Sequence, residues 1–181
     1  MHIIIVGATF SGKSKLAKMI AKQKAQAGHK VMVFDPLKTS GWPESAKLYA
    51  KPSAFVAAYW EAENVYVFID EAKVLFDKEP HEAERIAYQG RHGGRLNFFI
   101  GQRAMSMIPP NARNQCPRVY AFKQSVTDSD TLAKEYDERL NECPKLGKLE
   151  FLMSDGFSAA KGKLKFESAT ADLPTKIEVM K

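Results

Sequence analysis

Residues 2–14, "HIIIVGATFSGKS", join an apolar run to a glycine loop that ends in lysine and serine. The run at 2–6 is rich in β-branched residues and stops at a glycine, which is typical of a buried parallel strand. Residues 7–14 have the spacing Gly-x-x-x-x-Gly-Lys-Ser, in which glycines let backbone amides approach phosphate oxygens closely. A Lys- and Ala-rich stretch follows without Gly or Pro as far as Ala27, and it predicts a helix. The sequence therefore predicts a strand, a phosphate-binding loop and a helix in direct succession.

The residue types in this loop indicate ATP and Mg²⁺ as cofactors. Lys13 is expected to reach the outer phosphates, and Ser14 is expected to ligate Mg²⁺. The N-terminus of the following helix adds partial positive charge. The residues expected to hold the nucleotide are Gly7, Ala8, Thr9, Phe10, Ser11, Gly12, Lys13, Ser14 and Lys15.

Two carboxylates follow another apolar run, "VYVFIDEA", at residues 65–72. A buried strand here would deliver Asp70 to its C-terminal end, where the carboxylate can hold the Mg²⁺ shell. Glu71 can then orient or deprotonate a water that attacks the γ-phosphate. The alternatives are a capping aspartate and a glutamate that only begins a helix. We predict Asp70 as a metal ligand and Glu71 as the catalytic base.

The rest of the chain alternates between strand and helix patterns, which favours an α/β fold with a mainly parallel sheet between two helical layers. The tail at 148–168 predicts two strands joined by an Asp155-Gly156 turn. We expect a single domain over residues 1–181, with a core at about 1–142 and a C-terminal hairpin and tail at about 145–181. Further strands are expected at 30–34, 96–100 and 118–122, and further helices at 53–62, 79–90 and 128–141.

Lys161, Lys163 and Lys165 alternate along the second strand of this hairpin. The first interpretation is an exposed sheet edge that lysines protect from pairing. The alternative is a DNA contact.

Composition adds few constraints. The chain has 27 Lys and Arg against 21 Asp and Glu, a net charge of +6 that suits nucleic-acid contact and solubility equally. Two cysteines cannot build a disulfide framework or a four-cysteine zinc site. No run of about 18 apolar residues predicts a membrane helix, and no signal peptide is apparent. We therefore expect a cytoplasmic location.

Several segments resemble the FtsK/HerA superfamily of DNA-pumping ATPases, particularly the small genome-packaging ATPases of membrane-containing DNA viruses. They are "VFDPLK" at 33–38, "GRLNFFIGQR" at 94–103 and "CPRVYAFKQSVTDSDTL" at 116–132, in addition to the loop. The chain departs from that pattern at Leu37, which intrudes before Lys38, and at Gly101, where threonine is common.

This resemblance implies a P-loop NTPase fold with an additional strand between the two Walker strands. It also implies that Gln102, just past that strand, faces the γ-phosphate; the alternative is an exposed loop glutamine. The implied function is an ATP-driven DNA translocase that packages a viral genome as a homo-oligomeric ring. The implied partners are double-stranded DNA and capsid or portal-vertex proteins, in the host cytoplasm or within the virion.

Motors of this class resemble rings in which an arginine of one subunit completes the site of its neighbour. By position, Arg118 matches the arginine before the fifth strand of the superfamily. Arg91 and Arg113 are alternatives, and the other candidates are Arg95 and Arg103.

Two other resemblances keep alternatives open. The opening segment and "IDEA" at 69–72 are similar to thymidine kinases, although the four zinc-binding cysteines of that family are missing. The "RHGG" at 91–94 resembles filamentous-phage assembly ATPases, which usually carry a transmembrane segment. A slowly hydrolysing nucleotide switch is a third alternative.

Overall fold

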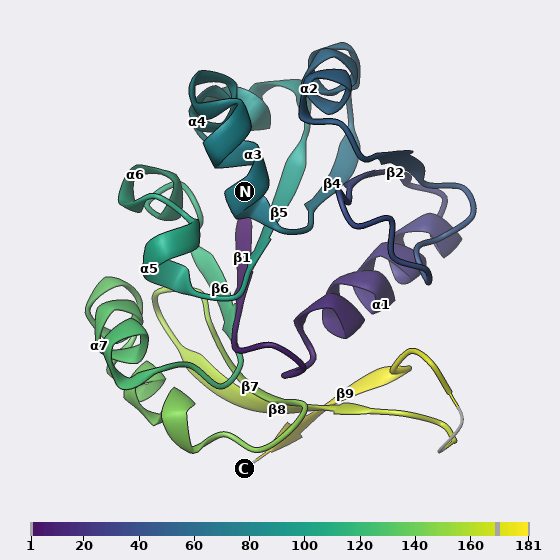
Figure 1. Ribbon diagram of the computed structural model, residues 1–181. Helices are drawn as coiled ribbons and strands as arrows, with labels where there is room; N and C mark the ends of the chain where they lie inside the picture. Colours follow the sequence, from purple (N-terminus) through teal and green to yellow (C-terminus); the bar gives the residue numbers. More distant parts are fainter. Residues whose placement is uncertain (1, 169–170, 181) are drawn as a thin grey trace.

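A computed structural model of the chain describes residues 2–168 and 171–180. Within these residues, nine strands form one sheet in the order β3-β2-β4-β5-β1-β6-β7-β8-β9 (Figure 1). The strands from β3 to β6 in this order are parallel, and the last three pairings are antiparallel. The bounds are β1 Ile3–Val6, β2 Lys30–Phe34, β3 Lys47–Tyr49, β4 Val65–Ile69, β5 Leu96–Gly101, β6 Arg118–Ala121, β7 Glu150–Ser154, β8 Ala159–Lys165 and β9 Lys176–Met180. The predicted α/β class with a mainly parallel sheet is confirmed.

Helices cover both faces of the sheet, so the fold has three layers (Figure 1). On one face, buried side chains of α1 pack against inward residues of β1, β2 and β5. On the other face, residues from the remaining long helices form a larger core. The bounds are α1 Lys13–Gln26, α2 Pro52–Glu61, α3 Ala72–Lys78, α4 Pro80–Gln89, α5 Ala104–Met107, α6 Pro110–Arg113 and α7 Val126–Glu135, with 3-10 helices η1 Gly90–Gly93 and η2 Glu138–Lys145.

Strand order brings the predicted site together. Strand β5 lies between β1 and β4, so the additional strand between the two Walker strands is confirmed. Parallel pairing aligns the carboxyl ends of the strands, with Val6 opposite both Gly101 and Ala121. The loop after β1, the carboxylates after β4 and the residue after β5 therefore meet at one edge of the sheet.

The C-terminal hairpin is present, but β8 is not an edge strand. Strand β9 pairs along its outer side, which makes the edge interpretation of the three lysines wrong. Lys161 and Lys163 lie 3.1 and 3.4 Å from Glu150, and Lys165 lies 2.9 Å from Glu178. These ion pairs set two carboxylates of neighbouring strands against the three lysines, so they offset most of the charge of the row.

The helix predicted at 128–141 is two elements. Helix α7 ends at Glu135, and η2 begins at Glu138, where the Asp137 side chain accepts a hydrogen bond from the Arg139 backbone N–H at 3.0 Å. This cap starts a new helical turn, so one continuous helix is not formed.

Candidate active site

The loop that joins β1 to α1 is shaped by its two glycines. A Cβ at Gly7 would lie only 2.5 Å from Phe122 Cβ, and Gly12 has a φ of 122°, which side chains rarely adopt. The Ala8 backbone N–H donates to the Lys123 carbonyl at 2.8 Å, which fixes the loop to the segment after β6. Close packing and backbone conformation thus both require glycine here.

Lys13 lies inside this loop as a buried cation. Its ammonium donates to the Ala8 carbonyl at 2.9 Å. Burial lowers the pKa of Lys13 below its usual value, while the charges of Glu71 and Asp70 act in the opposite direction. The Ser11 hydroxyl is also buried and has no hydrogen-bond partner among the described residues. A phosphate group would supply both side chains with a partner, so the loop is built for an anion.

Asp70 follows β4 directly and is 7% exposed. Its backbone N–H donates to the Phe34 carbonyl at 2.9 Å, which holds it at the end of the strand. Burial, together with the charges of Asp35 and Glu71, raises the pKa of Asp70 to about 6, although the charge of Lys18 acts to lower it. A buried carboxylate among like charges favours a cation beside it.

This environment fits Mg²⁺. The Ser14 hydroxyl, in the first turn of α1, and the Asp70 carboxylate are the oxygen donors that this chain would offer. No cluster of three or more His, Cys, Asp or Glu side chains suited to a metal is found in the part of the chain that the structure describes. The ion would therefore need phosphate and water oxygens to complete its shell.

Glu71 and Gln102 face the loop from the neighbouring strands. Glu71 has left-handed backbone angles, φ 53° and ψ 54°, which are costly for a non-glycine residue and often mark a functional position. The Thr9 hydroxyl donates to the Gln102 side-chain oxygen at 3.3 Å. A cavity of about 450 Å³ is lined by Thr9, Phe10, Gly12, Lys13, Ser14, Lys15, Glu71, Gln102, Lys148 and Leu149. Most of the predicted site residues thus share one cavity of a size that suits a nucleotide.

Two residues of this cavity come from the C-terminal extension and were not predicted. The Leu149 backbone N–H donates to the Ser11 carbonyl at 3.1 Å, and its carbonyl accepts from the Leu164 N–H at 3.0 Å. Leu149 therefore ties the loop to β8, and it places the exposed side chain of Lys148 at the cavity. No local pattern marks these residues, because their role depends on a contact with a loop more than 130 positions away.

A second polar cluster lies next to Asp70 and is centred on Asp35. The Asp35 carboxylate accepts from the Thr39 hydroxyl at 2.6 Å and from Trp42 Nε1 at 2.9 Å. Burial acts to raise the pKa of Asp35, but these hydrogen bonds hold it below its usual value. The Lys18 ammonium of α1 donates to Thr39 Oγ1 at 2.9 Å. The Asp-Pro segment noted in the sequence thus fixes α1 against the loop after β2.

Arg118 begins β6 opposite Ile3, at the other end of the sheet from the phosphate loop. Gly7 lies four residues beyond Ile3 along the chain, a distance of about 13 Å. Its Nε is buried and has no hydrogen-bond partner among the described residues. Arg118 therefore does not reach the phosphate loop of its own chain.

The other candidate arginines differ in whether contacts within the chain already hold their guanidinium groups. Arg95 donates to the carbonyls of Tyr59 and Trp60, and Arg113 is buried with its guanidinium 2.6 Å from Glu135. Arg103 pairs with Asp128 at 3.0 Å, whereas Arg91 is exposed in η1. Structural contacts thus occupy Arg95 and Arg113.

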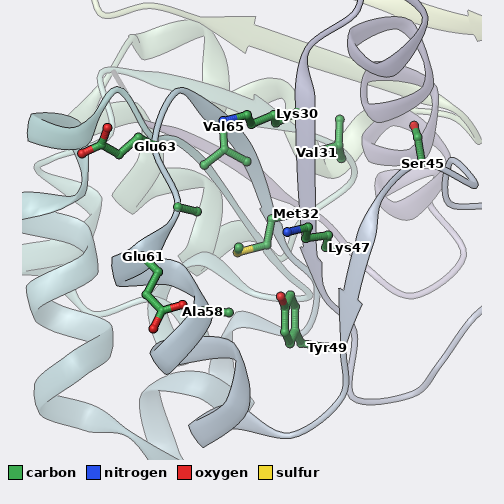
Figure 2. Close-up of a pocket in the computed structure, with 11 residues that line it drawn as sticks. Lys30, Val31, Met32, Ser45, Lys47, Tyr49, Ala58, Glu61, Glu63 and Val65 are labelled. Atoms are coloured by element: carbon green, nitrogen blue, oxygen red, sulfur yellow. The ribbon is translucent and has the colours of Figure 1, made fainter.

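A separate cavity of about 520 Å³ lies between β3 and α2, away from the loop. Figure 2 shows Lys30 and Lys47 on its strand side and Glu61 and Glu63 near the end of α2. It contains none of the predicted site residues. Over the described ranges, no helix is both long enough and apolar enough to cross a bilayer.

Comparisons with known proteins agree with this geometry. No family model and no curated protein sequence matches the chain. The genome-packaging NTPase B204 of Sulfolobus turreted icosahedral virus 2, solved with AMPPCP, matches 99% of this chain and 96% of its own with a TM-score of 0.70 and 17% identity. The conjugation coupling protein TcpA of pCW3, solved with ATPγS, matches 88% of this chain and 58% of its own with a TM-score of 0.69 and 17% identity.

The cytoplasmic domain of the type VII secretion ATPase EccC of Thermomonospora curvata matches 96% of this chain and 27% of its own, with a TM-score of 0.69 and 14% identity. These structures include a viral genome-packaging NTPase, the class that the sequence segments indicated, and also a conjugation coupling protein and a secretion ATPase. The chain therefore shares its fold with these nucleotide-hydrolysing proteins.

Proposed function

We propose that this chain is an ATPase that uses ATP hydrolysis to move double-stranded DNA. The observation that carries the proposal is the single cavity in which Lys13, Ser14, Glu71 and Gln102 meet at the edge of the sheet. This set combines a phosphate-binding cation, a metal-binding hydroxyl, a base and a polar group that can position water.

The residues divide the hydrolytic step between them. Lys13 leaves the Ala8 carbonyl and pairs with the outer phosphates, which become its partners in place of the loop. Glu71 orients a water and accepts its proton as the water oxygen bonds to the γ-phosphorus and the bond to the ADP oxygen breaks. Gln102 holds the water or a γ-phosphate oxygen. Ser14 and Asp70 would hold Mg²⁺, which would supply positive charge to balance the phosphates.

A neighbouring subunit completes the site in this proposal. Arg118 is too far from the loop of its own chain and lacks a hydrogen-bond partner for its buried Nε among the described residues. In a ring, it would neutralise charge on the phosphoryl group of the adjacent site. Arg91 is the alternative, since it is exposed.

The DNA substrate is supported by the similar structures rather than by a groove in this chain. B204 is described as a genome-packaging NTPase and TcpA as a conjugation coupling protein. We infer that this chain acts on viral DNA during packaging, with capsid or portal-vertex proteins as partners, in the host cytoplasm or within the virion.

ATP turnover with and without random duplex DNA tests the function. We expect DNA to raise the rate, and the gain to shrink as salt rises, because phosphate contacts release counterions. Lys13→Ala should abolish turnover while the protein stays folded. Thymidine is the parallel addition: stimulation by thymidine with indifference to DNA would favour a nucleoside kinase instead.

A further inference from the structure

Phe10 is an exposed aromatic residue at the tip of the phosphate loop. Its side chain is 91% exposed, and its φ of 62° is a left-handed value that is uncommon for a non-glycine residue. Exposed phenylalanine loses the free energy that burial of its ring would provide. The loop thus presents an apolar side chain to whatever lies against this edge of the sheet.

The opposite end of the same sheet carries a recess of about 420 Å³ on the α1 face. Apolar residues at the amino ends of three strands, Ile3, Leu96 and Tyr66, form part of its wall. Lys24 of α1 and Arg118 of β6 add two cations. No Asp or Glu among the described residues lines it.

The two cations in this recess have little to balance them. Arg118 Nε is buried without a hydrogen-bond partner in the described ranges. Lys24 lies over the Tyr66 ring, with its ammonium 4.8 Å from the ring centroid. The recess therefore combines apolar walls with unneutralised positive charge, a combination that suits an apolar side chain next to an anionic group.

We propose that Phe10 of one copy of this chain inserts into the recess of the next copy. This contact is heterologous, because it joins the carboxyl edge of one sheet to the amino end of another. It places Arg118 beside the phosphate loop of the neighbour, where Glu71 and a bound triphosphate supply the negative charge that the recess lacks. The inference rests on the proposed function for that triphosphate, and it identifies the surface through which neighbouring sites connect.

Assembly measured by light scattering after gel filtration, with a non-hydrolysable ATP analogue, tests the contact. Phe10→Ser should weaken association about tenfold or more, since each interface loses one buried ring. Phe157→Ser is the matched control, because Phe157 is 98% exposed at the tip of the β7–β8 hairpin and has no role in the contact. Equal assembly of the Phe10 variant and the wild type, or a chain that stays monomeric throughout, would overturn the proposal.

Cross-linking locates the contact directly. Chains with Phe10→Cys are mixed with chains with Leu96→Cys and treated with a short bifunctional maleimide. The natural Cys116 and Cys143 are both buried, so they contribute little background. We expect mixed dimers from this pair and not from Phe157→Cys with Leu96→Cys. Equal yields from both pairs would refute the assigned surface.

Nucleotide binding separates this inference from the proposed function. Leu96→Ser, on the recess side of the contact and outside the nucleotide cavity, should weaken association yet bind the fluorescent analogue mant-ATP like the wild type at concentrations where both are monomeric. If Leu96→Ser binds mant-ATP and also assembles like the wild type, the inference fails while the ATPase stands. If the wild type neither binds nor hydrolyses ATP but the Phe10→Cys and Leu96→Cys chains still cross-link specifically, the contact is supported and the ATPase is refuted.

Discussion

Acidification should destabilise this fold through His2, just before β1. Its ring is 1% exposed, and Nδ1 accepts a hydrogen bond from the Asn97 backbone N–H at 3.2 Å. Nε2 is buried without a partner in the described part of the chain. Burial lowers the pKa of His2 from 6.5 to about 4, because a charged imidazolium here would lose its hydration and its bond from Asn97.

The size of the effect follows from the two pKa values. A folded pKa below the unfolded one means that the unfolded chain binds the proton first, so stability falls as the pH drops from about 6.5 towards 4. The full shift is worth about 3.4 kcal/mol at 1.36 kcal/mol per unit, and about 2 kcal/mol of this is lost by pH ~5. Above pH ~7 the imidazole is neutral and contributes no such penalty.

Urea unfolding at pH ~7.5 and ~5 measures this loss. The variant His2→Gln keeps an acceptor but cannot titrate, so the stability difference between wild type and variant should shift by about 2 kcal/mol in favour of the variant at the lower pH. His81→Gln is the control, since His81 is exposed on α4. A wild type and a His2 variant that lose stability in parallel would refute the reasoning.

Three further predictions concern the nucleotide site. Glu71→Gln should slow ATP hydrolysis about 10²- to 10⁴-fold with little change in ATP affinity, since only the base is removed. Single-turnover assays and equilibrium binding measure the two effects, and a collapse of ATP affinity would assign Glu71 to the metal instead. Arg118→Ala should lower turnover about 10³-fold or more without loss of binding, and mixing it with Glu71→Gln chains should restore part of the rate; assembled mixtures without rescue would contradict a trans role. Lys148→Met should weaken ATP binding about tenfold, while the exposed control Lys145→Met should not; equal affinities in titrations with mant-ATP would exclude Lys148 from the site.

Local patterns were enough for the phosphate loop and its neighbours. Glycine spacing, an apolar run before it and a helix-forming stretch after it lie within about 25 residues and need no distant partner to be recognised. The strand that ends at Ile69, directly before Asp70, was found for the same reason. Placing Gln102 beside them required the resemblance, because the position of β5 between β1 and β4 is a property of the whole sheet.

Short and peripheral elements were missed where neighbours decide their structure. Strand β3 has three residues, and it exists because it pairs with β2. Strand β9 closes the outer side of β8 and turns a predicted edge into an interior strand, which pairs its lysines with Glu150 and Glu178. Whether a strand lies at the edge of a sheet depends on whether another strand pairs with its outer side, and the sequence of that strand alone does not show this.

The sequence by itself determined the chemistry that we propose for this protein: a glycine loop with Lys13 and Ser14 for phosphate and metal, and carboxylates that follow an apolar strand. Only the tertiary structure decided how these groups are completed. It set Leu149 against Ser11, opened the cavity to Lys148, and placed Arg118 at the far end of the sheet from its own loop. The physical reason is range: loop and strand propensities act between adjacent residues, whereas these placements depend on strand order and register across the whole sheet.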